Sequence, residues 1–163
     1  DYFYNYSEKG VTSNNGKYFY IDSGYANSNF DTTISTLAHE FQHMVNYNQK
    51  KVSHNLTSGQ WYNEMLSMLC EDMMQEHLGI KDEDSPKART KVFNEYYYYS
   101  GISEYNSKNQ ICSYATAFSF GSFIARNFGG AELVQKISQN SYVALNSSFN
   151  FRERIQSALK NIG

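Results

Sequence analysis

Two histidines that stand four positions apart, His39 and His43, constrain the fold of this chain more than any other feature. Apolar residues recur around them at intervals of three and four, as one buried helix face requires: Ile34, Leu37, Ala38, Phe41, Met44 and Val45. A helix turns roughly 100° per residue, so the two imidazoles lie one turn apart on the same side. We therefore expect a helix near residues 31–50 whose histidines bind one metal ion.

Glu64, which follows His43 by 21 positions, is the predicted third ligand. A second run of apolar residues surrounds it and predicts another helix near residues 60–79, packed beside the first. Catalytic zinc sites use three protein ligands and keep one position open. The set of His39, His43 and Glu64 thus predicts a site for one Zn²⁺ ion. Glu40 projects to the side of the ligands, where a general base is needed.

Two segments, 36–46 and 61–72, resemble the hyicolysin family of bacterial neutral zinc metallopeptidases. They read TLAHEFQHMVN and WYNEMLSMLCED. The resemblance covers about residues 18–130 and is specific in these two segments. The second segment is also similar to a helix of the zinc aminopeptidases that carries another Glu seven residues after the ligand Glu, and Glu71 stands at that position. The resemblance implies a zincin-like peptidase that acts on protein or peptide substrates.

The aminopeptidases also carry a Tyr at the start of a later helix, where its hydroxyl bonds the oxyanion of the reaction. The similar place in this chain is Tyr114, 50 residues after Glu64, although the Lys-Gly pair of that stretch is not kept. A phenol aimed at a developing oxyanion would be a sensible partner for zinc. Because the chain has 15 tyrosines, a purely structural role for Tyr114 is the alternative.

Two departures from these families bear on the site. Thermolysin-like enzymes have an Asp four residues after the ligand Glu, where it orients a ligand His, whereas this chain has Met68 there. Metal-bound histidines need an oxygen acceptor for their second N–H, so Glu71, Asp72 or a backbone carbonyl is expected to serve. The Gly-x-Met-Glu-Asn run with which aminopeptidases hold a free amine does not precede His39, which favours an endopeptidase.

Strands are predicted before the first histidine, within about residues 1–24. Tyr2–Tyr6 and Lys17–Asp22 are aromatic, β-branched or alternating and are bounded by Gly and Asn. In peptidases with such a site, an edge strand before the active helix receives the substrate backbone by strand addition. The residues of that candidate edge are Tyr18, Tyr20 and Asp22, and an ordinary core strand is the alternative.

Strands followed by helices predict an α+β domain that is mostly α: a zincin-like fold with a small N-terminal antiparallel sheet. The active-site helices are expected within about 31–79 and a helical C-terminal half within about 87–162. The helices expected in that half span residues 87–99, 114–127, 132–138 and 149–162.

The length of 163 residues and the hydrophobic content of 40% suffice for a single catalytic domain over residues 1–163. A net charge of −2 gives no sign of nucleic-acid binding, and no apolar run reaches the roughly 20 residues of a membrane span. Because the chain opens without Met, we expect a piece of a longer protein that is secreted or lies in the cell envelope. The oligomeric state stays open.

The two cysteines flank the predicted site along the chain. Cys70 follows Glu64 by six residues, and Cys112 precedes Tyr114 by two. A disulfide between them and two buried free thiols are both compatible with this spacing.

Three functions are compatible with these motifs. A zinc-dependent endopeptidase is favoured, an aminopeptidase-like exopeptidase on the same site is the first alternative, and a zinc-stabilised interaction domain without catalysis is the second. The intact Glu40 argues against the last of these.

Overall fold

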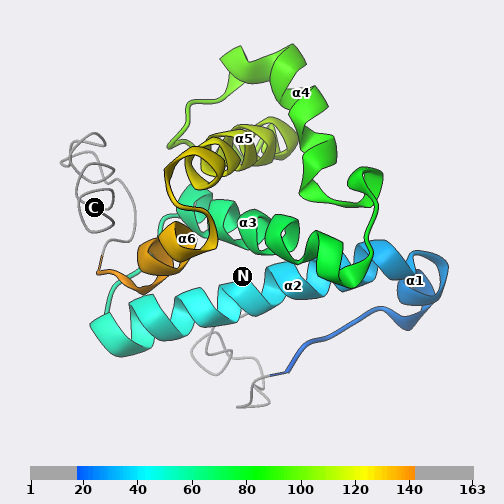
Figure 1. Cartoon of the computed structure of the whole chain (residues 1–163), viewed down its shortest axis with the longest axis horizontal. Helices are drawn as coiled ribbons and strands as arrows, with labels where there is room; N and C mark the ends of the chain where they lie inside the picture. Colours follow the sequence, from blue (N-terminus) through cyan, green and yellow to red (C-terminus); the bar gives the residue numbers. More distant parts are fainter. Residues whose placement is uncertain (1–17, 142–163) are drawn as a thin grey trace.

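The computed structural model describes residues 18–141, and its regular elements there are all helices (Figure 1). Six are α-helices: α1 (Ser23–Ser28), α2 (Phe30–Asn46), α3 (Gln60–Leu78), α4 (Arg89–Tyr96), α5 (Gln110–Phe128) and α6 (Gly130–Gln139). Helix α2 continues into a π-helical turn, η2 (Tyr47–Val52), and three short 3₁₀ turns follow: η3 (Asp82–Asp84), η4 (Pro86–Ala88) and η5 (Tyr97–Tyr99). The mostly helical character that the sequence predicts is confirmed.

The predicted N-terminal sheet is wrong for the part of the chain that the structure describes. Residues 18–22 form no strand, and Tyr18 and Tyr20 are 63% and 76% exposed. Asp22 caps helix α1 instead, because its carboxylate accepts a hydrogen bond from the backbone N–H of Tyr25. An alternating pattern forms a stable strand only where a neighbouring strand provides partners for its backbone hydrogen bonds. Residues 18–141 contain no strand at all.

Consequently Tyr18, Tyr20 and Asp22 form no edge that could receive a substrate. The predicted strand at Tyr2–Tyr6 and the predicted helix at 149–162 lie outside the described residues.

The helices that carry the site agree with their predicted spans. Helix α3 ends where the sequence indicates, because Gly79 adopts the left-handed conformation (φ 68°) that favours glycine at a helix stop. Helix α2 begins one residue before Asp31, and its N-cap is Asn29. The stretch predicted as one helix over 87–99 is divided into η4, α4 and η5.

Helices α2 and α3 pack side by side along the molecule, α5 packs against α3, and α6 contacts α5, α3 and α2 (Figure 1). Contacts along α2 and α3 advance in opposite directions, since Ser35 meets Glu71 whereas His43 meets Ser67. The pair is therefore antiparallel, with the returning helix bringing Glu64 back to the histidines. The buried core between α3, α5 and α6 comprises Trp61, Tyr62, Met65, Leu66, Met68, Leu69, Ala117, Phe118, Ile124, Ala125, Leu133, Val134 and Ile137.

A glycine sets how closely α5 approaches α3. A Cβ atom on Gly121 would lie 2.6 Å from Cγ of Met65 and 3.1 Å from Cδ1 of Leu69. Further along both helices, Arg126 donates two hydrogen bonds to the Asp72 carboxylate, at 2.8 and 2.7 Å. These contacts advance in the same direction along α3 and α5, so the beginnings of the two helices lie near each other.

The C-terminal end of α6 ties the ends of the two site helices together. The buried ammonium of Lys50, in η2, donates to the carbonyl oxygens of Ile137 and Asn140 and to the Asn140 side chain. The hydroxyl of Tyr62, in the first turn of α3, donates to the same Ile137 oxygen at 2.7 Å. Burial lowers the pKa of Lys50 to about 8. Cationic and phenolic donors thus occupy the free carbonyls at the end of α6, as helix termini require.

Candidate metal centre

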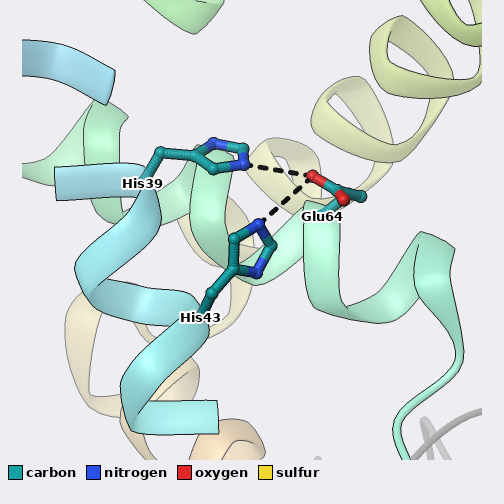
Figure 2. Close-up of side chains that lie close together, drawn as sticks. All are labelled: His39, His43 and Glu64. Atoms are coloured by element: carbon teal, nitrogen blue, oxygen red, sulfur yellow. Dashed lines mark hydrogen bonds and ion pairs between the residues drawn. The ribbon is translucent and has the colours of Figure 1, made fainter. Parts of the chain in front are cut away.

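Three side chains from α2 and α3 converge on one point (Figure 2). The Nε2 atoms of His39 and His43 lie 3.1 Å and 3.6 Å from the same carboxylate oxygen, Oε2 of Glu64. One ligand atom from each of these residues lies within 4.8 Å of the other two. The structure therefore brings together the three residues that the sequence predicts as ligands.

This donor set fits a zinc ion. Ligand atoms placed tetrahedrally at about 2.0–2.1 Å from zinc lie roughly 3.3 Å apart. The observed separations of 3.1 and 3.6 Å between the imidazole nitrogens and the carboxylate oxygen are close to that spacing. Two imidazoles and one carboxylate are ligands that zinc accepts in catalytic sites.

The three side chains are largely withdrawn from water. Their exposed fractions are 14% for His39, 4% for His43 and 10% for Glu64. Burial alone would lower the pKa of His39, but its hydrogen bonds to the Glu64 and Glu71 carboxylates outweigh burial and raise that pKa to about 9. The same contacts with the two histidines hold the pKa of Glu64 at about 2, although burial opposes this shift. Without metal, a proton on His39 therefore supplies the positive charge between two carboxylates.

The second nitrogen of each histidine also has an oxygen partner. Nδ1 of His39 donates to Oε1 of Glu71 at 2.7 Å, and Oε2 of Glu71 accepts from the Ser35 hydroxyl at 2.6 Å. Nδ1 of His43 shares a hydrogen bond of 3.0 Å with the Ser67 hydroxyl. These partners leave both Nε2 atoms turned towards Glu64, the arrangement that metal-binding histidines need.

Of the two carboxylates predicted to orient the histidines, Glu71 contacts His39 whereas Asp72 does not join this network. Asp72 pairs with Arg126 of α5 instead. Sequence reasoning missed the serines. Ser35 stands one turn before His39 on the same helix face, and Ser67 stands one turn after Glu64, so helical spacing was the available signal.

Glu40 is half-buried and has no hydrogen-bond or ion-pair partner within residues 18–141. It follows His39 directly on α2. Its carboxylate is therefore unpartnered among the described residues.

Tyr114 lies in the second turn of α5, where it packs against the core that contains Trp61. Its hydroxyl accepts a hydrogen bond of 3.3 Å from the hydroxyl of Tyr105, and the two rings meet edge to face. Burial raises the pKa of Tyr114, and the Tyr105 hydrogen bond and the nearby Glu64 carboxylate raise it further. The phenol therefore keeps its proton. Sequence reasoning missed Tyr105, which no motif marks.

The guanidinium of Arg89, the first residue of α4, lies over the face of the Tyr114 ring, 5.0 Å from its centroid. Its charge partly offsets the rise in the pKa of Tyr114. Sequence reasoning did not single out this residue either.

Both cysteines are free thiols, which agrees with the second of the two alternatives for them. Cys112 is buried, and burial raises the pKa of the half-buried Cys70. None of the helices in residues 18–141 combines the length and the apolar character needed to cross a membrane.

Two histidines and a glutamate are a ligand set that catalytic zinc sites of metallopeptidases use, and comparison with known proteins points to the same class. The sequence pattern of the Peptidase M30 family matches residues 2–161, so the chain belongs to that family. The predicted resemblance to the hyicolysin family is thereby confirmed.

A curated relative, the neutral metalloprotease ShpI of Staphylococcus hyicus, is 30% identical over 139 residues. The match covers 78% of this chain and 31% of the relative, so the chain spans about a third of that protein. No solved structure matches the chain.

Proposed function

We propose that this chain is the catalytic part of a zinc-dependent peptidase that cleaves bonds within protein or peptide chains. His39, His43 and Glu64 would hold one Zn²⁺ ion. The observation that carries the proposal is the convergence of both Nε2 atoms on Oε2 of Glu64. The hydrogen bonds at both Nδ1 atoms support it, because they leave the opposite nitrogens for the ion.

Glu40 is proposed as the general base. A bound Zn²⁺ ion would polarise the scissile carbonyl and lower the pKa of a water molecule beside it. The unpartnered carboxylate of Glu40 would take a proton from the attacking water, since nothing in residues 18–141 competes for it. The resulting carboxyl would then donate that proton to the leaving amine as the C–N bond breaks.

Tyr114 is proposed as a donor to the oxyanion. Its hydroxyl already accepts from Tyr105, so its own hydrogen is directed away from that partner. The charge of Glu64 raises the pKa of this phenol, and the ring packs against the core that contains Trp61 of the same helix as Glu64. A preorganised donor at that place would stabilise the charge that develops on the carbonyl oxygen.

The family membership and the metalloprotease relative support hydrolysis of peptide bonds. Endopeptidase action rests on the missing amine-binding run before His39, and a secreted or cell-envelope location stays a prediction. Since the chain spans about a third of that relative, the activity of the whole protein is also part of the proposal.

The test uses an internally quenched peptide blocked at both ends, zinc-loaded protein, and the variant Glu40→Gln, with metal content measured in both proteins. We expect cleavage by the wild type alone and one zinc per chain in both. Cleavage of peptides with a free amine but not of blocked peptides would point to an exopeptidase. Zinc in both proteins without any hydrolysis would favour an interaction domain.

A further inference from the structure

Arg89 carries a positive charge that no group within residues 18–141 neutralises. Its side chain makes neither an ion pair nor a hydrogen bond there, and the guanidinium lies over the face of the Tyr114 ring. Three other cations of these helices have carboxylate partners, since Arg126 pairs with Asp72, Lys87 with Asp82, and Lys136 with Glu132. Lys91 on the same helix also lacks such a partner among the described residues, but it is exposed, whereas Arg89 is half-buried. Arg89 is therefore a half-buried guanidinium with its donors available.

The way in which Arg89 is held suits it for binding an anion. A guanidinium held over an aromatic face is attracted by the ring electrons and does not need its N–H donors for this contact. Those donors form a rigid fork that matches the two oxygens of a carboxylate. The Tyr114 ring thus orients Arg89 without occupying the groups that would recognise a ligand.

The position of Arg89 is as informative as its lack of partners. Tyr114 connects Arg89 to the helix of the candidate metal centre, because one face of its ring carries the guanidinium and the ring packs against the core that contains Trp61 and Met65 of α3. The charge of Glu64, between these two core residues on α3, also raises the pKa of its hydroxyl. The contacts of Gly121 and Arg126 with α3 independently place the start of α5 near the start of α3. A peptide whose scissile carbonyl accepts from Tyr114 would therefore have its neighbouring residues within reach of Arg89.

We propose that Arg89 binds a carboxylate of the substrate next to the bond that is cut, and so gives the peptidase a preference for acidic peptide segments. This inference rests on the proposed function of the site. The carboxylate is that of an Asp or Glu side chain or that of a peptide C-terminus, and the two share the same chemistry.

The surroundings of the site sharpen this proposal. Glu64 and Glu71 place two carboxylates at the site, and Glu40 follows the ligand His39 directly in sequence. A bound Zn²⁺ ion would offset two of these three negative charges, and the remaining one would repel an acidic substrate. Arg89 must overcome that repulsion. Without the charge of Arg89, the enzyme should therefore cleave acidic peptides no faster than neutral ones, or more slowly.

The test compares quenched peptides that are blocked at both ends and differ by Glu against Gln at one position on either side of the cut. A second pair compares a free C-terminal carboxylate with an amide. The proteins are the zinc-loaded wild type, Arg89→Gln, Arg89→Lys and the control Lys91→Gln. Lys91 is an exposed cation on the same helix and has no contact with Tyr114. The quantity measured is kcat/KM for the acidic peptide of each pair divided by kcat/KM for its neutral partner.

We expect the wild type to favour the acidic member of a pair by roughly 10- to 100-fold, as hydrogen bonds to a charged group imply. The ratio should fall to one or below in Arg89→Gln, recover in part in Arg89→Lys, and stay unchanged in Lys91→Gln. The pair that shows the effect identifies the source of the carboxylate. Equal cleavage of both members by the wild type, or an unchanged ratio in Arg89→Gln, would overturn the proposal.

A binding arm separates this proposal from the proposed function. Dissociation constants of the same peptides are measured by fluorescence anisotropy on Glu40→Gln, with and without Arg89→Gln. If the wild type cleaves no peptide, the proposed function fails, and the ratio of dissociation constants decides the role of Arg89. The ratio is the dissociation constant of the neutral peptide divided by that of the acidic peptide. A ratio above one in Glu40→Gln that falls to one when Arg89→Gln is added supports the carboxylate site. A ratio of one in both proteins contradicts it.

Discussion

The Nδ1 atom of His39 lies 2.7 Å from Oε1 of Glu71, across the contact between α2 and α3. Because Glu71 also accepts from Ser35, its carboxylate is held from two sides and in turn fixes the imidazole ring. The candidate zinc ligand on α2 is thus oriented by a residue on α3, two turns after the candidate ligand Glu64.

Replacing Glu71 with Gln should weaken zinc binding by roughly 10- to 100-fold, the range found when partners of metal-bound histidines are changed. The amide is a weaker acceptor than the carboxylate for the N–H of His39. Competition with a chelating dye measures the change in the dissociation constant. Glu76→Gln is the matched control, because Glu76 is an exposed residue on the same helix. Equal affinities in all three proteins would contradict the role of Glu71.

Zinc binding should release a proton from His39. This imidazole has a pKa of about 9 in the metal-free protein, and zinc needs the neutral form. Apparent zinc affinity should therefore rise by about tenfold per pH unit up to pH 9 from this group and then level off. Calorimetry in buffers with different ionisation enthalpies counts the protons. A count of zero at pH 7 would show that His39 is already neutral there.

The metal-free protein should lose stability as the pH rises. The pKa of His39 is raised from 6.5 to about 9 on folding, so the folded state binds more protons than the unfolded state between these values. The contribution of His39 is fully present below pH 6.5 and is lost as the pH passes through 9. Urea denaturation with a chelator at several pH values checks this. His39→Gln should show less of this decline, and an identical decline in that variant would refute the assignment.

Tyr114→Phe should lower kcat by about 10²–10³-fold, the usual effect of losing one donor to the oxyanion. Tyr105→Phe should have a smaller effect in the same direction, because Tyr105 only orients the Tyr114 hydroxyl. Steady-state kinetics on the blocked peptide measures both. Tyr97→Phe serves as the control, since Tyr97 is exposed. Equal losses in all three variants would reveal a general effect of removing hydroxyls.

Gly121→Ala should destabilise the fold by about 1–3 kcal/mol, the usual range for overpacking. The new methyl group would lie 2.6 Å from Cγ of Met65, which a packed core does not accommodate without movement. Chemical denaturation measures the free energy of unfolding. In a double-mutant cycle with Met65→Ala, the second change should relieve part of the loss. Strictly additive effects would mean that the two residues do not clash.

Much of the site could be predicted from the spacing of a few residues. His39 and His43 stand at an interval that a helix converts into one face, and the apolar pattern around Glu64 predicts a second helix. The apolar face predicted for α2 is wrong in part, because Phe41 is 55% exposed and the buried residues of this helix are Thr33, Ser35, His43 and Asn46. The end of α3 at Gly79 follows from the backbone freedom of glycine at a left-handed position. These are local properties, and neighbours along the chain suffice to produce them.

The strand predicted over Lys17–Asp22 shows where local pattern is not enough. Alternation of side chains describes one strand, but a sheet needs a partner from elsewhere in the chain. Asp22 finds a closer partner in the N–H of Tyr25, and that bond starts a helix.

Sequence alone therefore determined the two helices that carry the candidate ligands His39, His43 and Glu64, since each helix depends on contacts within a few turns. Only the tertiary structure decided which groups surround them. Ser35 and Glu71 are 36 residues apart in sequence, and Arg89 reaches Tyr114 from another helix. Asp72 stands next to Glu71, yet the helix turns it towards Arg126 of α5. Such pairings follow from how closely the helices pack, which no stretch of sequence specifies on its own.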